Sequence, residues 1–183
     1  FTLDTAVAVP SETTVVTTPT KDTTPDVVIT TTQAGTIAVG GTTGCGVGDS
    51  AVALGANTVT LAASNGDGAY VCTVTFTDSA GNTAAALTLT SFTLDTAAAA
   101  PTETTPVAAL ANDATPDVVI TTAEAGTIVV GGTTGCGVGD SAVASGANTV
   151  TLSASNGDGA YVCTITFTDA LGNVAGSALT LTS

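Results

Sequence analysis

The chain has 183 residues and a formal net charge of −14, with 15 acidic residues, one lysine, no arginine and no histidine. Nucleic acids and anionic membrane surfaces are bound through Lys and Arg, so this composition excludes both kinds of partner. The absence of His removes the commonest general base and metal ligand. No apolar run approaches the roughly 18 residues of a membrane helix, so we expect no membrane insertion.

The predicted elements are short strands separated by turns, because Thr (41 residues) favours strands and Gly (21 residues) favours turns. The clearest strand is 70–77, where apolar residues alternate with Val and Thr. Between 36–39 and 58–62, we expect the Gly-rich run 40–48 to form a turn. Strands at this spacing favour a β-sandwich. In chain order, the first half predicts strands at 13–18, 27–32, 36–39, 58–62, 70–77 and 87–89.

The second half of the chain repeats the first. Residues 1–82 align with 92–173 without a gap, and 64 of the 82 positions are identical. Repeats of this length are whole domains, so we predict two domains, 1–91 and 92–183. Leu87 and Leu89 are out of phase with Phe92 and Leu94, which predicts either a bulge near Ser91 or a strand that ends there. The chain contains no Met, and we interpret it as a processed protein or a segment of a longer one.

Each repeat contains two cysteines, Cys45 and Cys72 in the first and Cys136 and Cys163 in the second. Pairing within each repeat would stabilise a small domain by closing a loop, and would indicate an oxidising, extracytoplasmic location. Two alternatives remain at this point. Four thiolates could bind zinc, although the spacing lacks the CxxC pattern of structural zinc sites, or the thiols could be free and buried.

Two sets of motifs resemble known immunoglobulin-like proteins. Tyr70-Val71-Cys72 and its copy at 161–163 resemble the tyrosine corner of immunoglobulin folds, although the core Trp is missing and the first Cys follows the third strand. The order FTLDT…P, AGTI, DGAYVCT and FTDxxGN, present in both repeats, is similar to bacterial Ig-like tandem repeats of secreted and surface proteins. The resemblance implies an all-β fold of two tandem immunoglobulin-like β-sandwich domains, each with one intradomain disulfide.

The acidic residues recur at equivalent positions in the two repeats and fall mostly in predicted turns. Asp and Asn are common in turns for local reasons alone, because their side chains bond nearby backbone amides. Some of the bacterial Ig-like repeat proteins that this chain resembles bind Ca²⁺ at domain junctions. Carboxylate and amide oxygens are ligands that Ca²⁺ prefers. We therefore expect no required cofactor, with Ca²⁺ as the candidate ion. The candidate ligands are Asp22, Asp67, Asp95, Asp169 and Asn173.

We carry two functional hypotheses, neither of them an enzyme, since Lys21 is the only side chain that could activate a hydroxyl. The first is a structural subunit or segment of an extracellular filament or surface fibre, whose partners are further repeats or copies of itself. Its joining strand would be Phe1–Thr5, pairing with the terminal LTLTS of a neighbour. The alternative is a ligand-binding adhesin module that recognises a glycan or a protein. The residues of the proposed joining strand are Phe1, Thr2, Leu3, Asp4 and Thr5.

Overall fold

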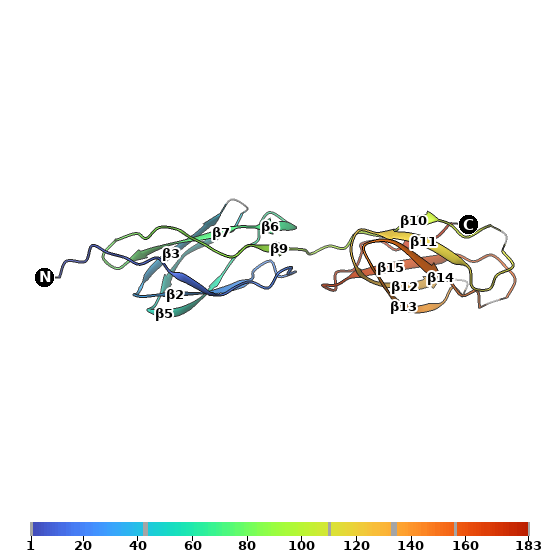
Figure 1. Ribbon diagram of the computed structural model, residues 1–183, viewed down its shortest axis with the longest axis horizontal. Coiled ribbons are helices and arrows are strands. Elements are labelled where there is room, and N and C mark those ends of the chain that lie inside the picture. Colours follow the sequence, from blue (N-terminus) through green and yellow to red (C-terminus); the bar gives the residue numbers. More distant parts are fainter. Residues whose placement is uncertain (1, 42–43, 110, 133–134, 156, 183) are drawn as a thin grey trace. The chain divides into compact units, whose positions relative to one another are not determined.

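The computed structural model describes residues 2–41, 44–109, 111–132, 135–155 and 157–182. The chain divides into two compact units, Phe1–Thr96 and Ala97–Ser183. The regular structure of the described residues is entirely β (Figure 1), which confirms the predicted all-β class. In the part of the chain that the structure describes, no helix has the length and apolarity needed to cross a membrane.

The first unit contains two main sheets and a short two-stranded one. One sheet has the order β1-β2-β5, the other has the order β4-β3-β7-β8, and β6 pairs with β9. Figure 1 shows β2 and β5 in one layer and β3 and β7 in the other. The strands are β1 (Ser11–Thr14), β2 (Asp26–Thr31), β3 (Gly35–Gly41), β4 (Val47–Val52), β5 (Gly55–Thr60), β6 (Gly68–Tyr70), β7 (Cys72–Asp78), β8 (Leu87–Thr88) and β9 (Phe92–Leu94).

The second unit repeats both main sheets, in the orders β10-β11-β14 and β13-β12-β15-β16. Its registers match those of the first unit, so that Asp26 lies opposite Thr60 and Asp117 lies opposite Thr151. The strands are β10 (Thr102–Thr105), β11 (Asp117–Thr122), β12 (Gly126–Gly132), β13 (Val138–Val143), β14 (Gly146–Thr151), β15 (Cys163–Asp169) and β16 (Leu179–Thr180).

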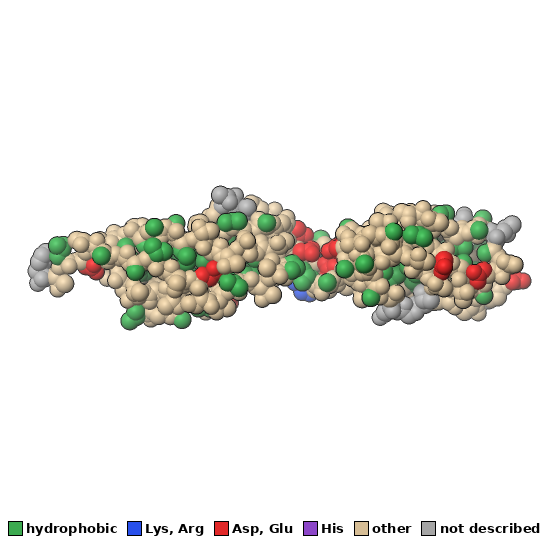
Figure 2. Space-filling view, viewed as in Figure 1, with side chains coloured by type: hydrophobic (Ala, Val, Ile, Leu, Met, Phe, Trp, Pro, Cys, Tyr) green, Lys and Arg blue, Asp and Glu red, His purple; other side chains and the backbone are tan. Residues whose placement is uncertain are grey.

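Alternation along the strands builds each core. In β7, Cys72, Val74, Phe76 and Asp78 are buried, whereas the three Thr residues between them are only half-buried. Side chains at every second position point to the same face of a strand, so β7 presents an apolar row to the opposite sheet. On the face shown in Figure 2, hydrophobic side chains are scattered among backbone and side chains of other kinds. The short-strand prediction and the sandwich are therefore confirmed.

The disulfides are those predicted, Cys45–Cys72 and Cys136–Cys163, each closing a sequence separation of 27 residues. The tyrosine motif also behaves as expected of a tyrosine corner. The Tyr70 hydroxyl donates to the Gly66 carbonyl at 2.7 Å and accepts from the Asn65 amide at 2.9 Å. Tyr161 donates to the Gly157 carbonyl at 2.7 Å.

The prediction of a turn over 40–48 is wrong at both ends. Strand β3 extends to Gly41, and β4 begins at Val47 and pairs with β3 along an edge of the sheet. The physical reason is that an edge strand is held mainly by its backbone ladder. The segment Val47–Val52 can therefore form a strand although its sequence, VGDSAV, lacks apolar alternation.

The sequence period and the structural units have different boundaries. The period changes between Ser91 and Phe92, but the chain divides by its contacts between Thr96 and Ala97. The change of apolar phase near Ser91 marks the end of one strand and the start of another. Strand β8 ends at Thr88, and Phe92–Leu94 forms a separate strand that pairs with β6 of the first unit. The FTLDT sequence that opens the second repeat thus completes the first unit.

A buried Asp organises the turn that follows β7 in the first unit and β15 in the second. Asp78 accepts from the Ala80 and Asn82 amides and from the side chains of Asn82 and Gln33, at 2.8–2.9 Å. These bonds, led by that of the Asn82 side chain, hold the pKa of Asp78 below its usual value. At Asp169, burial raises the pKa, but hydrogen bonds from Asn173 and Leu171 outweigh it and lower the pKa overall.

Loss of one disulfide should destabilise only its own unit. For the double substitution Cys45→Ala and Cys72→Ala, we expect the free energy of unfolding of the first unit to fall by roughly 3–4 kcal/mol, since the closed loop has the length for which chain entropy gives this value. Hydrogen exchange recorded at increasing denaturant concentrations measures the free energy of unfolding of each unit separately. The matched control, Cys136→Ala with Cys163→Ala, should produce the same loss in the second unit, and unchanged midpoints would contradict the prediction.

The turn carboxylates should make the protein sensitive to acid. Because the folded-state pKa of Asp78 and of Asp169 lies below the unfolded value of about 4, their contribution is present above that pH and is lost as the pH falls through the folded-state pKa. The variant Asp78→Asn with Asp169→Asn should be less stable at neutral pH and should lose less stability on acidification, as measured by thermal melting. Asp4→Asn is the control, and an equally steep acid loss in both variants would contradict the expectation.

Candidate functional site

The strand that completes the first unit is held on two sides. In β9, Phe92 and Leu94 are 2% and 1% exposed, whereas Thr93 between them faces outward. Phe92 lies opposite Tyr70 of β6, and the two rings stack with centroids 5.3 Å apart. On the other side, Leu94 forms a parallel bridge with Thr20. Figure 1 shows β9 running beside β6.

Hydrogen bonds reach almost every backbone amide of this segment. The Thr93 amide donates to the Thr18 hydroxyl and the Asp95 amide donates to the Thr20 carbonyl, both at 2.9 Å. The amide and hydroxyl of Thr96 both donate to the Asp67 carboxylate, at 2.9 and 2.7 Å. The FTLDT sequence is therefore recognised by an apolar groove, a backbone ladder and a carboxylate at its end.

The same region of the second unit is an open groove. It has a volume of about 630 Å³ and is lined by apolar side chains, by the disulfide Cys136–Cys163, and by polar residues that include Asp113 and Asp158. Tyr161 is half-buried, whereas its equivalent Tyr70 is 1% exposed beneath Phe92. Segment 159–161 is not a strand, although its equivalent in the first unit is β6. The main side chains that line the groove are Val107, Pro116, Leu152, Asp158, Tyr161 and Leu181.

The predicted joining strand lies on the surface. Thr2, Leu3, Asp4 and Thr5 are exposed, with Leu3 at 73%, and Phe1 lies outside the described residues. A hydrogen bond links it to a distant part of the first unit, from the Asn82 side chain to the Asp4 carbonyl at 3.2 Å. The structure therefore presents Thr2–Thr5, whose sequence is identical to that of 93–96, on the surface. Its pairing with a neighbour's LTLTS stays a prediction.

The candidate calcium ligands of the first unit lie at one end of it, but their carboxylates have separate roles. The Asp22 carboxylate accepts from the amide and hydroxyl of Thr24, which closes its own turn. The Asp67 carboxylate accepts from Thr96, as described above. Neither residue belongs to a group of three metal-ligating side chains among the described residues. These two carboxylates therefore fit a structural role in turns.

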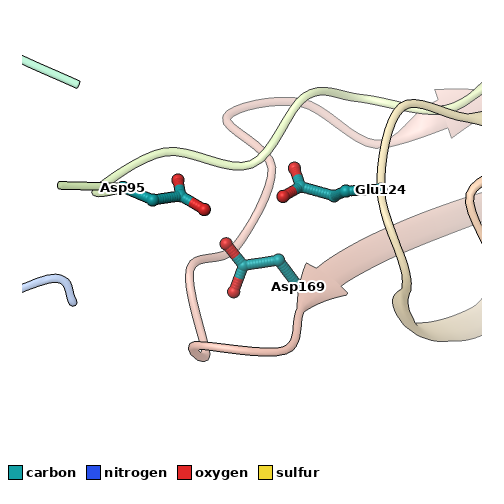
Figure 3. Close-up of side chains that lie close together, drawn as sticks. All are labelled: Asp95, Glu124 and Asp169. Carbon is teal, nitrogen blue, oxygen red and sulfur yellow. The ribbon is translucent and has the colours of Figure 1, made fainter. Parts of the chain in front are cut away.

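In the second unit, a different residue joins the predicted Asp169 and Asn173. Figure 3 shows the carboxylates of Glu124, on the connection between β11 and β12, and of Asp169, at the end of β15. Their oxygen atoms lie within 4.8 Å of each other. Asn173 donates through its side chain to Asp169 at 2.7 Å. Asp95, labelled in the same figure, belongs to the first unit.

Sequence reasoning missed Glu124 because it searched for acidic residues shared by the two repeats. The equivalent residue in the first unit is Gln33, whose side chain donates to Asp78 at 2.9 Å. The change from Gln33 to Glu124 replaces a hydrogen-bond donor with a second carboxylate beside a buried one. Comparison of the two repeats at their few differing positions, instead of their shared ones, would have found this residue.

Both the structure and the sequence of this chain can be compared with those of known proteins. The chain is similar to a solved structure described as "Biofilm associated protein - BSP domain", with 19% identity and a TM-score of 0.33, and the match covers 96% of this chain but only 29% of that one. No curated protein matches. Residues 3–96 match the model of a family described as bacterial Ig-like domain. This match spans half of the chain and confirms the expected resemblance, so the chain belongs to the bacterial Ig-like domain family.

Proposed function

We propose that this chain is a structural segment of an extracellular filament or surface fibre, built from tandem Ig-like domains that join head to tail by strand addition. One observation carries the proposal. The residues that open the second repeat, Phe92–Thr96, form part of the first unit and fill its groove. A unit of this design is completed by the first strand of the repeat that follows it, so growth of an array and completion of its domains are the same event.

The surface and the covalent structure support an extracellular location. Both disulfides form, and disulfides persist in oxidising compartments outside the cytoplasm. With 15 acidic residues and one Lys, repeated copies repel one another except where a specific joint overcomes the repulsion, which keeps an array soluble. Near-identical units also fit a repeated spacer better than a single recognition tip.

No cofactor is required by this proposal, and Ca²⁺ is the candidate ion that we propose for this segment. Oxygen atoms of the Glu124 and Asp169 carboxylates lie within 4.8 Å of each other, so the two negative charges repel. Carboxylate and amide oxygens are the ligands of Ca²⁺, and Asn173 adjoins the pair. The equivalent residues of the first unit are Gln33 and Asp78, and the Gln33 side chain donates a hydrogen bond to the Asp78 carboxylate.

Electron microscopy and light scattering of the purified chain test the structural function. We expect end-to-end oligomers whose mass rises with protein concentration, because each added subunit buries a strand. A glycan array on the same material tests the alternative. Selective glycan binding by a chain that stays monomeric at all concentrations would favour the adhesin module and contradict the filament.

Calcium should raise the melting temperature of the native chain, and a chelator should reverse the change, because the ion offsets the repulsion between Glu124 and Asp169. In Glu124→Gln, which recreates the arrangement of the first unit, we expect greater stability without calcium and no response to it. The matched control is Gln33→Glu, which should lower the stability of the first unit. Equal melting of the native chain with calcium and with chelator would reject the ion.

A further inference from the structure

We propose that the groove of the second unit is a binding site for the segment Phe1–Thr5 of a second copy of this chain. The inference rests on the proposed head-to-tail function and deepens it, since it names the acceptor surface and the chemistry of its ligand. It also replaces the partner expected from the sequence: the acceptor is the Tyr161 groove with the edge 159–161, instead of the terminal LTLTS strand alone.

The first unit supplies the precedent for the occupant. Its groove holds FTLDT at 92–96, and the segment 1–5 has the same sequence. The apolar wall is also the same in both units. Val16, Pro25, Leu61, Tyr70 and Leu89 of the first unit correspond to Val107, Pro116, Leu152, Tyr161 and Leu181 of the second.

Burial shows what the occupant does to this wall. Val16, Tyr70 and Leu89 are buried in the first core, together with Phe92 and Leu94. Their equivalents Val107, Tyr161 and Leu181 are only partly buried at the edge of the second core. The same side chains therefore change from core to groove lining where no FTL strand covers them. An apolar strand that enters the groove would remove their surfaces from water, which is the main driving force for association.

The register of β6 and β9 assigns a place to each residue of the ligand. Phe92 lies opposite Tyr70, Thr93 opposite Ala69 and Leu94 opposite Gly68. By equivalence, Phe1 stacks on Tyr161, Thr2 lies opposite Ala160 and points outward, and Leu3 enters the groove opposite Gly159. The Asp158 carboxylate then accepts from the amide and hydroxyl of Thr5, as Asp67 does from Thr96.

Among the positions at which the two grooves differ, two correspond to residues that bond to the strand in the first unit. Ala109 replaces Thr18, so the hydroxyl that accepts from the Thr93 amide has no counterpart in the second unit. Ala111 replaces Thr20, but Thr20 contacts the strand through its backbone, which any residue can provide. The second groove thus recognises the same pentapeptide with one side-chain hydrogen bond fewer. The donor is accessible, since Thr2–Thr5 are exposed.

Adjacent positions on the donor strand provide a matched test. Both Thr2→Asp and Leu3→Asp add one charge to exposed residues of the full chain, so neither should unfold it. We expect Leu3→Asp to weaken self-association by about tenfold or more in light scattering, because its side chain enters the groove. Thr2→Asp, at the outward position, should change self-association by no more than about threefold, and equal loss in both variants would overturn the proposed register.

Cross-linking identifies the acceptor. One chain carries Thr2→Cys and a second carries Ala160→Cys, since residues directly opposite on paired strands bring their Cβ atoms within disulfide reach. Mixed under mild oxidation, they should form a disulfide-linked heterodimer whose peptides join positions 2 and 160 in mass spectrometry. Ser145→Cys, exposed in the same unit, replaces Ala160→Cys as the control and should give little product.

The outcomes separate this site from the general function. Oligomers that form normally with Leu3→Asp and give no 2–160 link would overturn the groove and leave the filament standing. A second outcome is that the chain stays monomeric while a synthetic FTLDTAVAVP peptide protects the amides of Tyr161 and Gly159 from exchange in NMR. This result would show that the groove binds the sequence but that a second copy does not occupy it, and the filament proposal would fail as well. The 2–160 link together with the selective loss in Leu3→Asp would establish the proposal.

Discussion

Burial of one short strand, Phe92–Leu94, is the interaction on which the organisation of this protein depends. Two inward side chains are removed from water almost completely, and one of them stacks on the tyrosine of the tyrosine corner. That stacking connects the strand to β6 and, through the adjacent Cys72, to the disulfide and β7. The strand comes from the beginning of the next sequence repeat, so two buried core residues of the first unit are encoded outside the first repeat.

Much of the fold could be predicted from the sequence because alternation has a direct physical meaning in strands. β2, β5 and β7 alternate and were located, and the Tyr-x-Cys motif and the cysteine pairing both have the expected geometry. β4 was missed because an edge strand needs only a backbone partner. The pairing of β6 with β9 was missed because Phe92 and Leu94 signal burial without indicating which domain buries them.

The candidate site was predictable only in part, for a similar reason. Asp22, Asp67 and Asp169 were identified by their residue type, but a carboxylate in a turn has the same signature whether it accepts from Thr24 and Thr96 or faces a second carboxylate. Only the structure distinguishes these roles. The informative residue, Glu124, is one that differs between the two repeats, and such a difference shows where the chemistry of the two units differs.

The offset between the sequence repeat and the folded unit has a genetic consequence. When a duplication copies one period, from Phe1 to Ser91, each new copy carries at its start the strand that its predecessor needs. Unequal recombination can therefore lengthen or shorten such a gene by whole periods, and every internal unit still finds its last strand in the next copy. Selection on array length can act without a separate adjustment of each domain, since an internal domain of this design receives its last strand from the repeat that follows it.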